Sequence, residues 1–161
     1  SYPNVLLILV GDGPLRVQLE ADANRMGLGR SVIFAGHQEQ AYDFINMVDV
    51  FVLPSLHEGI PMVLLEALAL RRPVVASRVG GIPEVLADGY SGVLVLPTNA
   101  EELAAAIQSL IENPSKAVDF GASGRSQVES EFSAGLMATR TAEMYRTLQT
   151  GVTLGGGPHG S

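Results

Sequence analysis

Two glutamates eight residues apart, Glu58 and Glu66, have the clearest chemical potential in this sequence. Glu58 follows an apolar segment, 49–53, and precedes Pro61, a residue typical of the first turn of a helix. Amides in a first helical turn have no acceptor within the helix and can therefore hold a phosphate. Here those amides belong to Met62, Val63 and Leu64. A carboxylate beside a phosphate is unfavourable unless it binds hydroxyls, so the stretch predicts a ligand with both groups, such as a sugar phosphate.

Glu66 is the one charged residue in the apolar run from Val63 to Leu70. A carboxylate inside an apolar helix is unfavourable unless it is paired or hydrogen-bonded. Two interpretations remain open on the residues alone. Glu66 forms a structural ion pair with an arginine, or it accepts hydrogen bonds from the vicinal hydroxyls of a ribose.

Glycine-rich turns follow two other apolar segments. Gly11 and Gly13 lie where a phosphate-binding loop would, but the third glycine of the dinucleotide fingerprint is replaced by Arg16, and no phosphate-loop lysine follows. This turn either contacts a ligand or simply reverses the chain. Gly80 and Gly81 are interpreted as a plain left-handed turn before a helix.

The elements that must position these residues alternate between strands and helices. Strands are predicted at 5–10, 31–35, 49–53, 73–76 and 92–96. Helices are predicted to begin at Pro14, Ala41, Pro61 and Pro83, and to cover 101–111 after an Asn99 cap, about 115–131, and 134–148. This order predicts an α/β fold, a Rossmann-like parallel sheet with helices on both faces, whose ligands bind beyond the carboxyl ends of the strands. The unbroken apolar run Val5–Val10 predicts a strand buried on both faces.

Composition narrows the function further. The chain has 161 residues, 47% of them hydrophobic, with no cysteine and a net charge of −7. One lysine and scattered arginines argue against nucleic-acid binding. The sequence does not favour a metal site, because it has no thiols and its histidines, His37, His57 and His159, are far apart. A lone histidine in a loop is usually solvated. No apolar run reaches the ~18 residues of a membrane span and no signal-peptide pattern begins the chain, so we expect a cytoplasmic protein.

Six motifs in this order resemble the carboxyl-terminal, donor-binding domain of the group 1 glycosyltransferases, which are retaining enzymes of the GT-B type. The resemblance runs from Val5 to about Tyr145. The motifs are Val10-Gly11-Asp12-Gly13-Pro14, Val32–Gly36, Asp49–Ser55, Glu58-Gly59 with Glu66-Ala67, Pro73–Ser77 and Gly80–Glu84.

The resemblance implies a role for each candidate residue. Glu66 would hold the ribose hydroxyls of a nucleotide diphosphate sugar, and Glu58, the candidate catalytic residue, would face the hydroxyls of the donor sugar. The sugar would be lined by the backbone of Gly59, Ile60 and Pro61, and the distal phosphate would meet the amides of Met62, Val63 and Leu64. Gly36, His37 and Gln38 would border the base, and Gly11 and Gly13 count among the donor-binding residues. Members generally transfer the sugar with retention and need no metal, so we expect no cofactor.

The chain departs from the family pattern in two respects. A small residue or glycine usually precedes the Pro-Val-Val strand, where this chain has Arg71-Arg72, interpreted as a solvated turn. The family domain also begins with a further strand, whose arginine and lysine neutralise the diphosphate, and an acceptor domain precedes it. We therefore expect residues 1–150 to be a partial donor-binding domain and residues 151–161 a flexible glycine-rich tail. The expected partners are the nucleotide-sugar donor and the absent acceptor domain. Any peripheral association with a membrane would occur only through that acceptor domain.

The resemblance favours the donor half of a sugar transferase, inactive as a fragment. A non-catalytic nucleotide-sugar binding module and a GT-B type nucleotide-sugar epimerase remain as alternatives. The sugar, the base and the acceptor are not specified by the residues. Without the first family strand, which would be central, Val5–Val10 and Asp49–Leu53 would each present an unpaired edge. The two strands then pair directly, a second chain supplies the missing strand, or the fragment aggregates. We expect direct pairing, because both strands are apolar on both faces and parallel closure needs no new connection.

Overall fold

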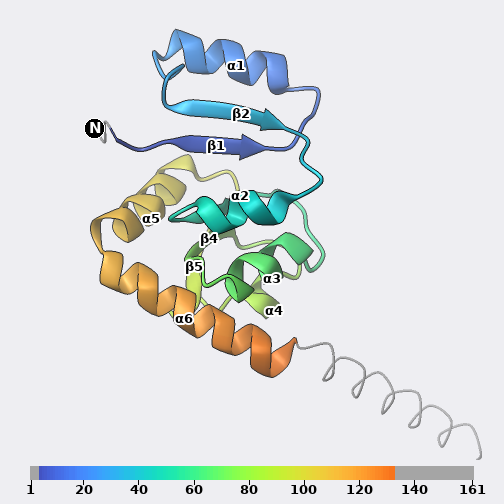
Figure 1. Ribbon diagram of the computed structural model, residues 1–161, viewed down its shortest axis with the longest axis vertical. Coiled ribbons are helices and arrows are strands. Elements are labelled where there is room, and N and C mark those ends of the chain that lie inside the picture. The colour runs from blue at the N-terminus through green and yellow to red at the C-terminus, as the bar shows by residue number, and fades with distance from the viewer. Residues whose placement is uncertain (1–3, 133–161) are drawn as a thin grey trace, which may run out of the picture. The chain divides into compact units, whose positions relative to one another are not determined.

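A computed structural model describes residues 4–132 of the chain, and they fall into two units that divide after Val48 (Figure 1). The predicted helix 134–148 and the tail 151–161 lie outside the described residues. Each unit is described separately below.

The first unit is a βαβ arrangement followed by a short helix. Strand β1 (Leu7–Val10) pairs in parallel with β2 (Val32–Gly36), and α1 (Arg16–Arg25) connects them. Helix α1 ends where predicted, because Gly27 takes the left-handed conformation, with φ of 71°, just beyond its last turn. Helix α2 (Ala41–Met47) completes the unit and has the bounds expected from the sequence.

The prediction that Val5–Val10 is buried on both faces is wrong. Leu7 and Val10 of β1 are 47% and 42% exposed, and α1 has no buried residue. Two strands and one helix have too few neighbours to cover both faces of a strand. An apolar run indicates what a strand tends to bury, and the layers packed around it decide whether it is buried.

The second unit contains a parallel sheet in the order β3-β4-β5. Its strands are β3 (Phe51–Leu53), β4 (Val74–Ser77) and β5 (Gly92–Val95). They alternate with the helices α3 (Met62–Ala69), α4 (Ile82–Val85), α5 (Ala100–Glu112) and α6 (Pro114–Glu131). The five strands therefore confirm the predicted α/β, Rossmann-like fold, divided between two parallel sheets.

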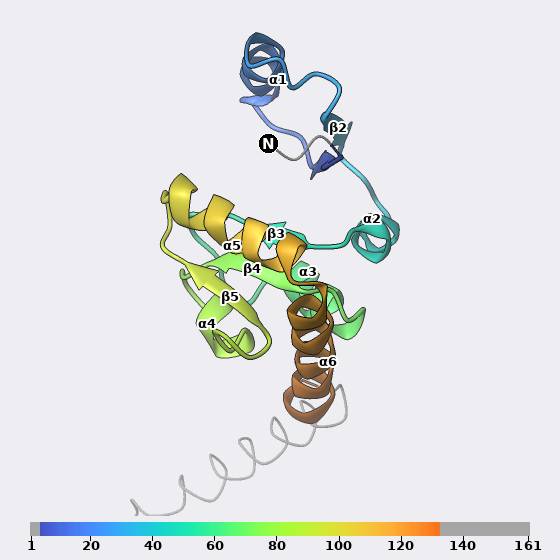
Figure 2. The ribbon, with the colours of Figure 1, turned by 90° about the vertical axis from the view of Figure 1, so that its left-hand side faces the viewer.

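The core of the second unit surrounds its central strand, β4, whose four residues are all buried. Val75 and Val95 pack with Ala106 and Leu110 of α5 and with Phe120 of α6. Figure 2 shows α5 and α4 on opposite sides of the sheet. Helix α5 begins as predicted, since the side chain of Asn99 accepts a hydrogen bond of 3.0 Å from the amide of Glu102.

The predicted ladder between Val5–Val10 and Asp49–Leu53 is wrong. Within residues 4–132, β1 pairs with β2 and β3 pairs with β4, and no backbone ladder joins the two sheets. The short βαβ connections bring sequential strands together inside each unit, whereas a β1–β3 pair would have to join strands of two separate units. One edge of β1 and one edge of β3 thus carry no ladder in the described part of the chain.

Candidate functional site

The loop between β3 and α3 holds Glu58 by its side chain. The hydroxyl of Ser55 donates a hydrogen bond of 2.7 Å to Oε1 of Glu58. Both residues are half-buried. No hydrogen bond to the second carboxylate oxygen, Oε2, is found among residues 4–132.

The turn after β4 holds the same loop by its backbone. Gly80 has a φ of 52°, and a Cβ added there would lie 1.8 Å from the carbonyl oxygen of Glu58. The amide of Gly81 donates a hydrogen bond of 3.1 Å to the carbonyl oxygen of Gly59. The left-handed turn expected at Gly80 is confirmed, but it is also a close approach of two backbones, which only glycine permits.

The first turn of α3 supplies free amides, though fewer than predicted. The amide of Leu64 donates a bond of 3.0 Å to the carbonyl oxygen of Pro61, so the prediction that it lacks an acceptor is wrong. A tight bond to the third preceding residue is a common way to close a helix start. The amides of Met62 and Val63 have no acceptor in the described part of the chain. They are the two that could meet an anionic group.

Glu66 lies in the middle of α3 and is half-buried. No arginine or lysine among residues 4–132 forms an ion pair with it, and no side chain there donates a hydrogen bond to it. The structural ion pair considered for Glu66 therefore has no support in this part of the chain. The carboxylate is free to accept bonds from a ligand.

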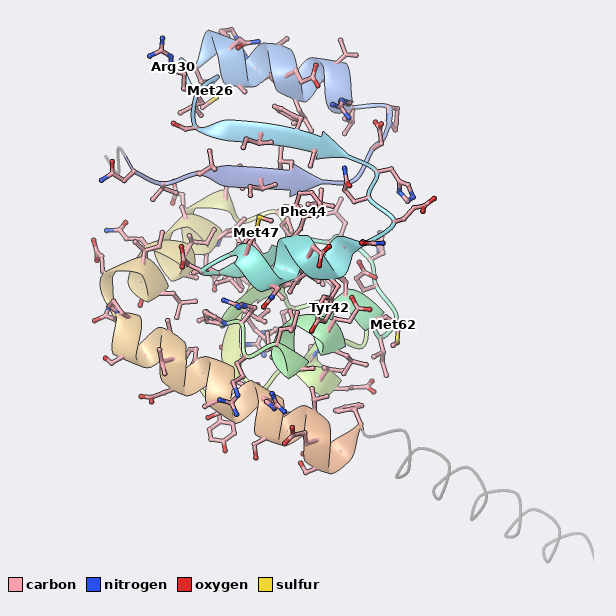
Figure 3. The ribbon with its side chains drawn as sticks, in the orientation of Figure 1. Met26, Arg30, Tyr42, Phe44, Met47 and Met62 are labelled. Atoms are coloured by element: carbon pink, nitrogen blue, oxygen red, sulfur yellow. The ribbon has the colours of Figure 1, made fainter. Side chains whose placement is uncertain are left out.

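The side chains between the two glutamates divide into core and surface. Pro61 and Leu64 are buried, so they would contribute backbone atoms alone to a site. Ile60 and Met62 are exposed, and Figure 3 shows Met62 on the outside of α3. A Cβ added to Gly59 would meet no atom within 4 Å, so the space beside this residue is open.

In the first unit, the two predicted ligand-side turns lie together. The amide of Gly11, whose φ is 128°, donates a bond of 2.8 Å to the carbonyl oxygen of Gly36. The side-chain amide of Gln38 donates to the carbonyl oxygen of Ala35 at 2.7 Å, and His37 is exposed. The turn that begins at Gly11 therefore adjoins the segment expected to border the base.

Arg16, which sequence reasoning treated only as a missing glycine, supports these turns. Its guanidinium donates to Glu20 at 2.8 Å, to the backbone oxygen of Phe34 at 3.3 Å and to Asp12 at 3.4 Å. The hydrogen bond with Glu20 is the main reason that the pKa of Arg16 is raised. The spacing of four residues between Asp12, Arg16 and Glu20 is the signal that could have identified this network.

Other features of the described residues lie apart from these loops. A shallow cavity of about 240 Å³ between the turn before β5 and the end of α6 is lined by Tyr90 and Gln127, among others, and by none of the predicted site residues. No group of three histidine, aspartate or glutamate side chains within residues 4–132 is placed to hold a metal ion. A search of the same residues found no helix long and apolar enough to cross a membrane.

Comparison with known protein families gives one match over most of the chain. The family model described as glycosyl transferases group 1 matches residues 1–127. Among curated proteins, an α-maltose-1-phosphate synthase of Mycolicibacterium smegmatis is 36% identical, over 89% of this chain and 41% of its own length. A glycogen synthase of Mycobacterium tuberculosis is 31% identical, over 94% of this chain and 37% of its own length. The chain thus spans about two fifths of these relatives.

Three solved structures are similar to this chain in fold. HepE of Anabaena, crystallised with UDP-glucose, matches with a TM-score of 0.83 and 27% identity over 91% of this chain and 42% of its own. A sucrose-phosphate synthase of Thermosynechococcus elongatus matches with a TM-score of 0.81 and 32% identity over 92% and 40%. The C-terminal domain of LpcC from Francisella tularensis matches with 0.76 and 25% identity over 83% and 73%.

Proposed function

Because the chain belongs to the glycosyl transferases of group 1, we propose that it is the donor-binding part of an enzyme that transfers a sugar from a nucleotide diphosphate sugar to an acceptor. The single observation that carries this proposal is the start of α3. Two amides without acceptors, those of Met62 and Val63, lie between two carboxylates that have no ion-pair partner among the described residues. An anion with flanking hydroxyls satisfies all of these groups together.

Each group of the donor has a proposed partner. Glu66 accepts hydrogen bonds from the ribose hydroxyls, and Oε2 of Glu58 accepts one from the donor sugar. The amides of Met62 and Val63 donate to the distal phosphate, where the helix end adds a charge of about +0.5. The sugar lies against the open side of Gly59, where a ligand meets no Cβ.

Retention of configuration and independence from metal ions belong to the same proposal. The family resemblance supports both. Binding of UDP-glucose that is equal in Mg²⁺ and in EDTA would support the second, and binding that is lost in EDTA would contradict it.

The chain matches only about two fifths of the length of its relatives, which favours a second function for the isolated chain. A polypeptide that spans two fifths of a transferase would bind the donor without transferring it, as a nucleotide-sugar binding module. The reading frame upstream discriminates between the two, since an acceptor domain encoded there makes this chain part of an enzyme. The family model, which is one of transferases, favours transfer over epimerisation.

A thermal-shift screen of the full 161-residue chain against UDP, GDP, ADP and UDP-glucose tests the proposal. UDP is the first choice, because the HepE structures contain UDP and UDP-glucose. A ligand at 100 times its dissociation constant stabilises the folded chain by about 2.7 kcal/mol, which raises the melting temperature by several degrees. A chain that melts at the same temperature with all four nucleotides contradicts the proposal.

A further inference from the structure

Ser55 donates a side-chain hydrogen bond to Glu58 in the described part of the chain. Its hydroxyl lies 2.7 Å from Oε1 of Glu58, which is a short, charge-assisted hydrogen bond. Ser55 follows Pro54, whose ring fixes the backbone just beyond the last residue of β3. The hydroxyl therefore comes from a loop position close to the end of β3, whereas Glu58 lies further along the same loop.

From this contact we propose that Ser55 is a positioning residue for recognition of the donor sugar, an inference that rests on the proposed function. By occupying Oε1, the hydroxyl holds the carboxylate plane and directs Oε2 toward the ligand. Gly80 and Gly81 hold the backbone of the same loop against the turn after β4. With the backbone and one carboxylate oxygen restrained, Oε2 is the atom of Glu58 left to accept a hydrogen bond.

A purely structural role for Ser55 would give a different signature. If the bond only closed the loop, its loss would lower the melting temperature and weaken UDP and UDP-glucose equally. A positioning role concerns only the part of the ligand that Glu58 meets. Loss of the hydroxyl would then reduce the advantage of UDP-glucose over UDP and leave UDP binding unchanged.

The test is isothermal titration calorimetry of the full chain with UDP and with UDP-glucose, for the wild type, Ser55→Ala and Ser55→Thr. The quantity compared between variants is the dissociation constant of UDP divided by that of UDP-glucose, which measures the advantage of UDP-glucose. We expect Ser55→Ala to reduce this ratio by about tenfold or more, as for the loss of a hydrogen bond to a charged group. Ser55→Thr should restore it, because threonine keeps the hydroxyl.

Ser109→Ala is the matched control, because the Ser109 hydroxyl accepts a bond from Lys116 on the outside of α5 and α6. An unchanged ratio in Ser55→Ala overturns the inference, and so does an equal loss of affinity for both ligands with a lower melting temperature. A wild-type chain that binds neither UDP nor UDP-glucose, and neither GDP nor ADP in the thermal-shift screen, contradicts the proposed function itself. A wild-type chain that binds UDP and UDP-glucose equally well contradicts the sugar contact of Glu58, and the role of Ser55 with it.

Discussion

Glu66 has apolar neighbours along α3 and no partner among residues 4–132 that would explain its presence there. A half-buried carboxylate keeps some hydration, so it is tolerated in the folded chain, but it adds nothing that an apolar residue would not. The proposed hydrogen bonds from ligand hydroxyls would give it a function. A substitution of Glu66 should therefore change ligand affinity and leave the stability of the fold almost unchanged.

We expect Glu66→Ala to weaken UDP binding by about 1.5–3 kcal/mol, the range for hydrogen bonds to a charged group. The melting temperature should hardly change, because no ion pair in the described part of the chain is broken. Calorimetry and thermal melts of one variant measure both quantities, with Glu101→Ala on the exposed start of α5 as a control. A large loss of stability with unchanged affinity would instead show that Glu66 is a structural residue.

Gly80 is expected to tolerate no side chain. Gly80→Ala should cost about 1–2 kcal/mol for the left-handed backbone and about 1–3 kcal/mol more for the overlap with the carbonyl oxygen of Glu58. Gly89→Ala is a matched control, since Gly89 is also left-handed but a Cβ there would meet nothing within 4 Å. Urea unfolding of both variants isolates the overlap by difference. Equal losses of stability would mean that the two loops are not in close contact.

Among the residues of the site, the sequence was most informative where a residue type has few possible structural roles in its context. The paired glutamates and the glycine turns stand out because charge in an apolar run and left-handed backbone both need a reason. The bond from Ser55 to Glu58 and the network of Arg16 were not predicted, because serine and arginine have many uses and their partners depend on the fold.

At the scale of elements, the end of α3 explains the departure from the family pattern. The amides of Arg71 and Arg72 donate 2.9 Å bonds to the carbonyl oxygens of Leu68 and Ala67, which is a Schellman motif. Arg71 occupies its left-handed position with a φ of 58°, where glycine is the usual residue. The interpretation of this turn as simply solvated missed the backbone conformation.

Arg71→Gly should therefore stabilise the chain. Relief of the left-handed strain gains about 1–2 kcal/mol, and the greater freedom of glycine in the unfolded chain offsets about 0.5–1 kcal/mol of it. We expect a net gain of about 0.5–1 kcal/mol in the free energy of unfolding, measured in urea. Arg71→Ala keeps the Cβ and should give no gain, so equal effects of the two variants would contradict this explanation.

The order and type of the elements could be predicted because each strand and helix has a local cause in composition, periodicity or caps. The Asn99 cap predicted the start of α5, and the helix predicted over about 115–131 matches α6 to within a residue. Burial of β1 and the pairing of β1 with β3 could not be predicted, because both depend on neighbours that are distant in the sequence.

At the scale of the whole molecule, buried residues are concentrated in the second unit. Apart from Gly36 and Ile45, the buried residues of the described chain lie between Pro61 and Gly124. The loops that carry Glu58 and the start of α3 are therefore built on the better packed unit. This supports a site whose geometry is formed before the ligand binds.

We expect the 161-residue chain to transfer no sugar by itself. Transfer needs donor and acceptor held together, and this positioning accounts for about 7–11 kcal/mol of a typical barrier. The chain spans about two fifths of its relatives, and the family resemblance assigns the acceptor to the remainder. Incubation with UDP-glucose and a panel of acceptor sugars, with chromatography of the products, would measure this, and turnover at a rate typical of complete enzymes would contradict it.

The most direct test of the central claim follows the backbone amides of the 161-residue chain by ¹H–¹⁵N NMR during titration with UDP. The start of α3 should meet the phosphate, so the amide signals of Met62 and Val63 should shift with the nucleotide concentration, while that of Leu64, already bonded to Pro61, should move less. Glu66→Ala should require more UDP for the same shifts. If UDP binds and shifts other amides while those of Met62 and Val63 stay in place, the nucleotide does not bind at α3 and the proposed site is wrong.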